Sequence, residues 1–132
     1  MWTSKIQSKV FTRIKTEGTK KLKKCYPDIC FTTSSKKSSN PKFPTVYLKR
    51  MQGAEKGQTL DGTTVNALIS TFQVEVVDNV SDDRAQEVAD VIYGVMKTMG
   101  YQVLGEPVAD NTNDEYRNVA RYQRLIGAND II

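Results

Sequence analysis

Few residues of this chain are of the types that most often act as general bases, nucleophiles or metal ligands. Histidine is absent, which removes the commonest general base, the usual partner of a serine or cysteine nucleophile, and the commonest metal ligand. Cys25 and Cys30 are the only thiols, so a structural zinc ion would need two carboxylate ligands from elsewhere. Because the amino end has no signal-peptide core, we expect both cysteines to be reduced.

A glycine-containing run and two acidic pairs are the remaining candidates. The run at 57–64, GQTLDGTT, has the glycine spacing of a phosphate-binding loop, but Thr63 stands where that motif needs lysine. The acidic pairs fall at an expected helix start and in an expected turn, where backbone chemistry accounts for them: Asp82 with Asp83, and Asp114 with Glu115. The sequence therefore predicts no enzymatic activity, no metal and no cofactor.

Charge is divided unevenly along the chain, which carries a formal net charge of +4. Residues 1–60 hold 14 Lys/Arg against 3 Asp/Glu, or +11, and residues 61–132 hold 5 against 12, or −7. A basic series with interleaved aromatic residues is the best candidate for contact with DNA or an acidic partner: Lys20, Lys21, Lys23, Lys24, Lys36 and Lys37. The alternative is a solvated basic face that binds nothing.

Apolar spacing predicts two helices and about five strands. Trp2, Ile6, Val10 and Ile14 recur every fourth residue, which indicates a helix that ends at Gly18 or frays through the lysines after it. A second helix is expected from an N-cap at Ser81 to Gly100. Alternating and β-prone runs predict strands at 29–33, 45–51, 67–77, 101–104 and 116–126.

The order α-β-β-β-α-β-β predicts one α+β domain over residues 1–132, with a mostly antiparallel sheet and both helices packed on one face. The other face is expected to be polar and to meet water or another subunit; it carries Thr71, Gln73, Glu75, Arg117, Arg121 and Gln123. Residues 34–42 and 53–64 are predicted to be mobile loops, and the second is long enough that a binding role is expected. No apolar run reaches the roughly 18 residues of a membrane span, so a cytoplasmic origin is expected.

Several sequence segments resemble the tail terminator proteins of long-tailed bacteriophages, also called tail completion or head-tail joining proteins. They are FPTVYL at 43–48, GQTLDGTT at 57–64, STFQVEV at 70–76, MKTMGY at 96–101 and YRNVARY at 116–122. The resemblance covers about residues 26–126 and lies in these phrases and in the order of elements. It implies a small α+β subunit that forms a hexameric ring on the last ring of tail-tube protein, halts tube polymerisation, and presents a surface to the head-completion, or stopper, protein.

The resemblance also implies where contacts lie. A loop that reaches the tail tube or a neighbour would contain Gly53, Glu55, Lys56, Gly57, Gln58, Leu60, Asp61 and Gly62; an idle loop is the alternative. Subunit-interface candidates are Phe43, Tyr47, Gln73, Glu75, Arg117 and Arg121. Such a protein would be assembled in the host cytoplasm and would lie at the head-proximal end of the tail in the virion. The resemblance leaves open a transient contact with genomic DNA in the channel. The alternative function is that of a nucleic-acid-binding module that uses the basic amino-terminal half.

Overall fold

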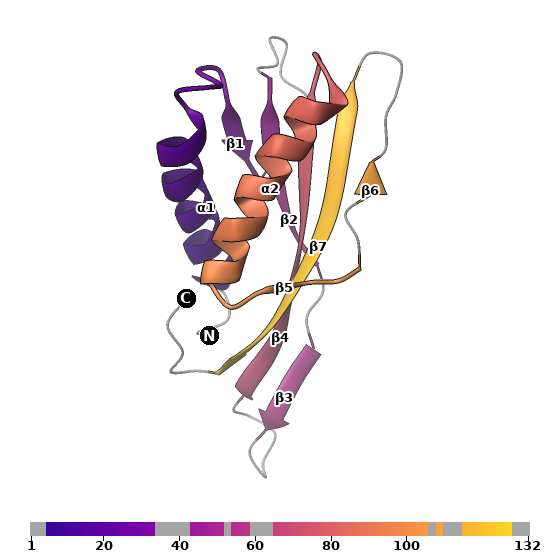
Figure 1. The fold of residues 1–132 in the computed structure, drawn as a ribbon. Coiled ribbons are helices and arrows are strands. Elements are labelled where there is room, and N and C mark those ends of the chain that lie inside the picture. Colours follow the sequence, from indigo (N-terminus) through magenta and orange to yellow (C-terminus); the bar gives the residue numbers. More distant parts are fainter. Residues whose placement is uncertain are drawn as a thin grey trace.

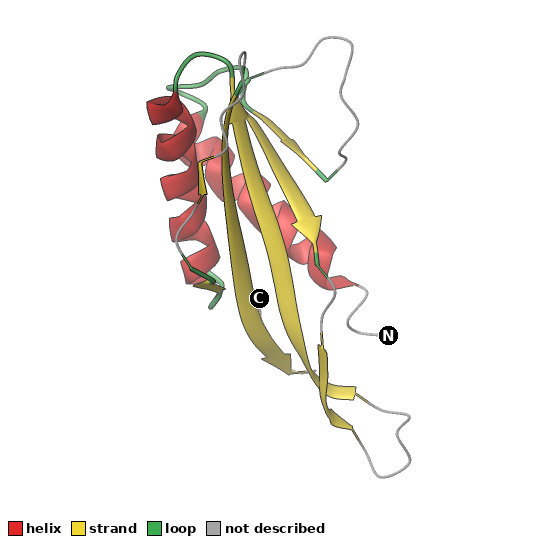
Figure 2. Ribbon diagram, turned by 90° about the vertical axis from the view of Figure 1, so that its right-hand side faces the viewer, coloured by secondary structure: helices red, strands yellow, loops and turns green. Residues whose placement is uncertain are grey.

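The computed structural model describes residues 5–33, 43–51, 54–58, 65–105, 108–109 and 115–127, with the backbone alone at 54–58 and 65–68. These residues form two helices and one seven-stranded sheet, in the order α1-β1-β2-β3-β4-α2-β5-β6-β7. Both helices pack against the same face of the sheet (Figures 1 and 2). The predicted α+β class, with a mostly antiparallel sheet covered on one face, is confirmed.

Helix α1 (Ile6–Leu22) is the first predicted helix, and it continues past Gly18. Every fourth residue from Ile6 to Leu22 is buried, so one stripe faces the core along the whole helix. Gly18 is part of that stripe because the ring of Phe31, in β1 (Cys30–Thr32), lies against it; a Cβ at Gly18 would be 2.7 Å from Phe31 Cζ. The glycine therefore permits close packing and does not end the helix.

Helix α2 (Asp82–Thr98) matches the second predicted helix. Ser81 is its N-cap, and Ser81 Oγ accepts a hydrogen bond from the Arg84 amide at 3.3 Å. The helix buries a stripe that runs from Ala85 through Val88 and Ile92. The chain leaves it through Gly100, whose φ of +81° lies in the left-handed region that glycine adopts without strain.

The sheet has the strand order β1-β2-β4-β7-β5, with β3 paired to β4 and β6 paired to β7. The strand bounds are β2 (Thr45–Arg50), β3 (Ala54–Gln58), β4 (Val65–Asp78), β5 (Gln102–Val103), β6 (Val108–Ala109) and β7 (Tyr116–Gly127). Only β1 and β2 pair in parallel; all other described pairs are antiparallel. The centre of the sheet is the β4–β7 pair, which runs from Ala67↔Gly127 to Asp78↔Tyr116.

The predicted mobile loop at 53–64 is wrong over residues 54–58, which form β3 and pair with β4 between Val65 and Ile69. Ala54–Gln58 has no large apolar side chain, so its sequence carries no strand pattern. The long β4 supplies the backbone hydrogen-bonding partners that make it a strand. Strand β6 is also absent from the prediction, because its two residues are too few to show an alternating pattern. The predicted loop at 34–42 lies outside the described residues.

The core lies between the helices and the inward face of β2, β4 and β7. Its side chains from the sheet include Val46, Leu48, Phe72, Val74 and Tyr122, each 3% exposed or less. Among the described residues, neither helix has the length and apolar character needed to cross a membrane.

Candidate interaction surface

The sheet face turned away from the helices is here named the outer sheet face. Successive side chains of a strand point to opposite sides. Because Phe72, Val74 and Val76 of β4 are in the core, Gln73 and Glu75 belong to the outer sheet face. The same alternation places three further predicted interface residues there: Tyr47 of β2, and Arg117 and Arg121 of β7. Phe43, the sixth predicted interface residue, lies half-buried in the turn before β2 and outside any strand.

Four of the predicted interface residues are joined by hydrogen bonds into one polar row. Arg117 Nη2 donates to Glu75 Oε1, and Gln73 Nε2 donates to the same oxygen at 2.6 Å. Arg121 Nε donates to Gln73 Oε1 at 3.2 Å, across a pair of directly opposed residues. Tyr47 stands opposite Glu75 on the other side of β4. The structure therefore brings together residues that the sequence could assign only to the same face.

The hydrogen bonds of the polar row contribute more to the orientation of its side chains than to the stability of the fold. The side chains of Arg117 and Glu75 are 38% and 15% exposed. An ion pair with one partner this open to water contributes at most about 1 kcal/mol. The bonds hold four polar groups in one geometry on the outer sheet face, where Gln73 is only 9% exposed. Exposed apolar side chains flank the row, with Val108 of β6 at 60% exposure and Leu125 of β7 at 58%.

The predicted contact loop is divided by the structure. Glu55, Lys56, Gly57 and Gln58 are in β3, whose backbone pairs with the first part of β4. This two-stranded ribbon extends beyond both helices at the lower end of the molecule (Figure 1). The other predicted contact residues, Gly53, Leu60, Asp61 and Gly62, lie outside the described residues.

The predicted basic contacts are on the helix side of the molecule. Lys20, Lys21, Lys23 and Lys24 are exposed at the end of α1 and in the turn after it. The Lys20 ammonium is 3.9 Å from Glu17. Lys36 and Lys37 lie outside the described residues. The structure thus separates the four described lysines from the outer sheet face, because α1 packs on the opposite side of the sheet.

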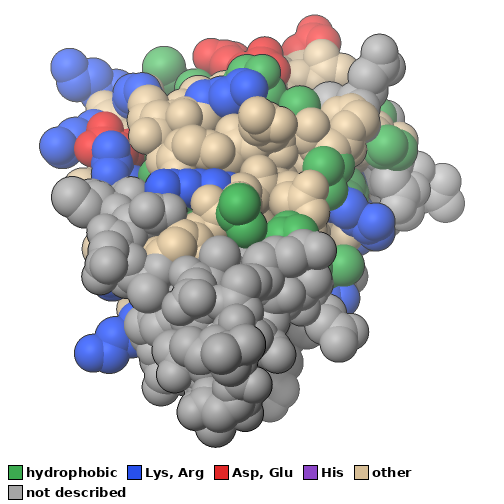
Figure 3. Space-filling view, turned by 90° about the horizontal axis from the view of Figure 1, so that it is seen from below, with side chains coloured by type: hydrophobic (Ala, Val, Ile, Leu, Met, Phe, Trp, Pro, Cys, Tyr) green, Lys and Arg blue, Asp and Glu red, His purple; other side chains and the backbone are tan. Residues whose placement is uncertain are grey.

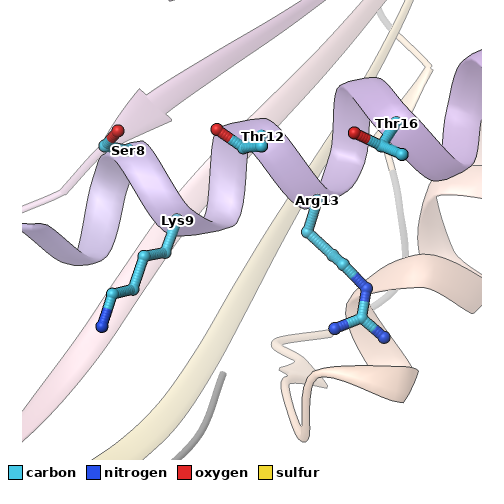
Figure 4. Close-up of a pocket in the computed structure, with 5 residues that line it drawn as sticks. All are labelled: Ser8, Lys9, Thr12, Arg13 and Thr16. Atoms are coloured by element: carbon cyan, nitrogen blue, oxygen red, sulfur yellow. The ribbon is translucent and has the colours of Figure 1, made fainter.

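A pocket on the outward side of α1 was missed by the sequence reasoning. It is lined by Ser8, Lys9, Thr12, Arg13 and Thr16. The three hydroxyl side chains form one row along the helix, and Lys9 and Arg13 extend from its other side (Figure 4). The spacing of Ser8, Thr12 and Thr16 by four residues was a readable signal, since it places three hydroxyls on one helical face.

The sequence pattern also did not predict a buried polar cluster around Asp78. Asp78 at the end of β4 is fully buried, and Asp78 Oδ2 accepts from the Ser81 amide at 3.3 Å and lies 3.5 Å from Arg84 Nε. The Arg84 guanidinium is 5.0 Å from the centroid of the Tyr26 ring. Burial, together with the 2.6 Å hydrogen bond that Tyr26 donates to Glu87, raises the pKa of Tyr26 to about 12. These contacts tie the turn after α1 to the start of α2.

The described residues contain no group of three or more His, Cys, Asp or Glu side chains arranged to hold a metal ion. Comparison with known proteins supplies no family: no protein-family model matches the chain, and no curated protein matches it significantly.

Proposed function

We propose that copies of this chain form a hexameric ring that caps a bacteriophage tail tube, stops its polymerisation and joins it to the head-completion protein. The protein then acts at the head-proximal end of the tail in the virion and has no enzymatic activity. The observation that carries this proposal is the polar row on the outer sheet face. Two of the phrases that resemble tail terminators, at 70–76 and 116–122, are the paired segments of β4 and β7 that supply all four residues of the row.

A face of this kind is suited to docking against another protein. Its polar side chains are already ordered by their mutual hydrogen bonds, so binding loses little additional side-chain entropy. The flanking Val108 and Leu125 supply apolar area that water now covers. No described helix covers this face (Figure 2).

The ribbon of β3 and β4 supports an axial contact with the tube. It continues the central sheet beyond the helix layer (Figure 1). No described helix of the same subunit covers it there. Its outer strand has an unpaired edge in the described sheet, since β3 pairs with β4 alone. Such an edge is a ready template for a strand of a neighbouring protein.

The direct experiment is co-assembly with tail-tube protein, with tube length measured by electron microscopy. We expect tubes that stop growing and carry the chain at one end. The informative variant is the swap Glu75→Arg/Arg117→Glu, which keeps an ion pair between β4 and β7 but reverses its polarity. We expect the melting temperature to stay near that of the wild type. Capping should be lost, because the tail-tube protein meets reversed charges.

Wild-type capping by the swap variant would show that the row serves the fold alone. The same assay applied to a chain lacking residues 53–64 tests the ribbon. We expect that chain to form rings but to leave tube length uncontrolled, and normal tube lengths would exclude the ribbon as the axial contact. Circular dichroism of each variant checks that the sheet is retained.

Nucleic-acid binding is the second candidate, supported by the exposed lysines at the end of α1. It requires an affinity for duplex DNA that falls with salt, with a slope of about −0.9 per phosphate neutralised. Neutralising Lys20, Lys21, Lys23 and Lys24 should flatten that slope. A gel at low salt that shows no shift with duplex DNA would end this alternative.

A further inference from the structure

The outward side of α1 is strongly basic. Between residues 5 and 22 the helix and its N-cap carry Lys5, Lys9, Arg13, Lys15, Lys20 and Lys21, against one acidic residue, Glu17. Lys5, Lys9 and Arg13 follow one another at intervals of four residues, so they form a stripe about 12 Å long. We name these three residues the basic stripe; Lys9 and Arg13 extend from one side of α1, and the hydroxyls of Ser8, Thr12 and Thr16 lie on the other (Figure 4).

Helix α2 carries an acidic counterpart. Asp83, Glu87 and Asp90 are all exposed and are spaced by four and three residues, so they share one side of the helix over about 10 Å. We name them the acidic stripe. The helix dipole favours Asp83 in the first turn, but Asp90 lies two turns further on, where that effect has faded. The two stripes are thus similar in length and opposite in charge.

We propose that the basic stripe of one copy docks on the acidic stripe of the next copy and forms the repeating contact of the ring. This inference rests on the proposed function, which requires a self-association that repeats in one direction. A head-to-tail contact needs two different patches on each subunit. The helix layer offers them on adjacent sides of the molecule: seen from below, Lys and Arg side chains gather on the side where α1 lies, and Asp and Glu side chains gather along a neighbouring side (Figure 3).

Charge complementarity favours a second copy of the chain over DNA as the partner of the basic stripe. A polyanion that lies along α1 would approach the carboxylates of α2 in the same helix layer, because α1 and α2 are in contact. A second copy instead brings carboxylates to the basic stripe and lysines to the acidic stripe. Contacts between two basic or two acidic stripes are repelled, which fixes the direction of the ring.

The experiment uses two charge-reversed variants of the full chain, Lys9→Glu/Arg13→Glu and Asp83→Lys/Asp90→Lys. Glu87 is left unchanged because it accepts the Tyr26 hydrogen bond. Self-association is measured by analytical ultracentrifugation at low salt, where charges are least screened. We expect each variant alone to associate with a Kd at least about a hundredfold above that of the wild type, because like charges then face each other.

Mixing the two variants provides the decisive result. In an equimolar mixture every reversed stripe finds a partner of opposite sign on the other variant, so assemblies of alternating copies should form. A chain with all four substitutions should also associate by itself. The control for Lys9→Glu/Arg13→Glu is Lys49→Glu/Arg50→Glu, which makes the same change of net charge as that variant at exposed positions of β2 and should associate like the wild type.

The outcomes separate this inference from the ring itself. Wild-type association that survives Lys9→Glu/Arg13→Glu, or two variants that stay apart when mixed, overturns the stripe contact and leaves the ring proposal standing. A wild-type chain that remains monomeric at low salt overturns both. If Lys9→Glu/Arg13→Glu abolishes a gel shift of duplex DNA and leaves self-association unchanged, the basic stripe is a nucleic-acid site instead.

Discussion

Gly18 in the middle of α1 provides a test in which two physical effects oppose each other. Replacing glycine by alanine in a helix interior normally stabilises by about 0.5–1 kcal/mol, because the unfolded chain loses freedom. Here a Cβ would stand 2.7 Å from Phe31 Cζ and 2.9 Å from Phe31 Cε1. Both distances are below any normal carbon–carbon contact, so the ring of Phe31 has to move.

The magnitude follows from the two terms. Adding a methyl group to a filled site costs roughly 1–3 kcal/mol. Phe31 is partly buried against the core, so part of the strain is relieved by a shift of its ring toward solvent. We therefore expect Gly18→Ala to destabilise the protein by about 1 kcal/mol, which lowers the melting temperature by roughly 3–5 °C for a chain of this size. In a Phe31→Val background, which removes both contacting carbons, the same change should stabilise by about 0.5–1 kcal/mol.

Urea unfolding of the wild type, the two single variants and the double variant measures the coupling between the two positions. The sign of the Gly18→Ala effect should differ between the two backgrounds. If Gly18→Ala stabilises the protein with Phe31 intact, the packing of β1 against α1 is not as described, and the glycine has no structural role in the helix.

Three further changes test other parts of the fold. Burial, followed by the neighbouring Tyr93 and Asp90, raises the pKa of Tyr122 to about 12. The stability linked to this group is complete below pH about 10 and is lost as pH rises through about 12, so Tyr122→Phe should make the decline of urea midpoints over that interval shallower. Ile92→Ala, at a fully buried position of α2, should cost about 2–5 kcal/mol in urea unfolding; a loss as small as that of a surface variant would contradict its burial. Ser81→Ala should cost about 1 kcal/mol through the lost N-cap, and no change in midpoint would contradict the cap.

The large elements of the fold were predictable because their side chains report them directly. The four-residue spacing that begins at Ile6, the cap and stripe of α2, and the alternation in β4 each reflect burial of one side of an element. These signals are local in sequence. They gave the class, the helices and the long strands, and they assigned Gln73, Glu75, Arg117 and Arg121 to one polar face.

What failed depends on partners that are distant in sequence. Strand β3 exists because β4 lies beside it, and its own residues give no sign of this. Glu75 and Arg117 are 42 positions apart, so their bond required the register of β4 against β7. The role of Gly18 depends on Phe31, a residue of another element. In each case the deciding contact is tertiary, and composition and periodicity do not contain it.

The two proposed contacts use opposite sides of the molecule, and this makes them separable. The stripes lie on the helix layer and the polar row lies on the outer sheet face, with the core between them. Substitutions at distant positions that share no partner act independently to a good approximation. Reversing the stripes should therefore prevent self-association, and swapping Glu75 with Arg117 should leave association intact while capping fails. If swapping Glu75 with Arg117 also abolishes self-association, the polar row belongs to the contact between copies, and a flat ring with a separate axial face is the wrong geometry.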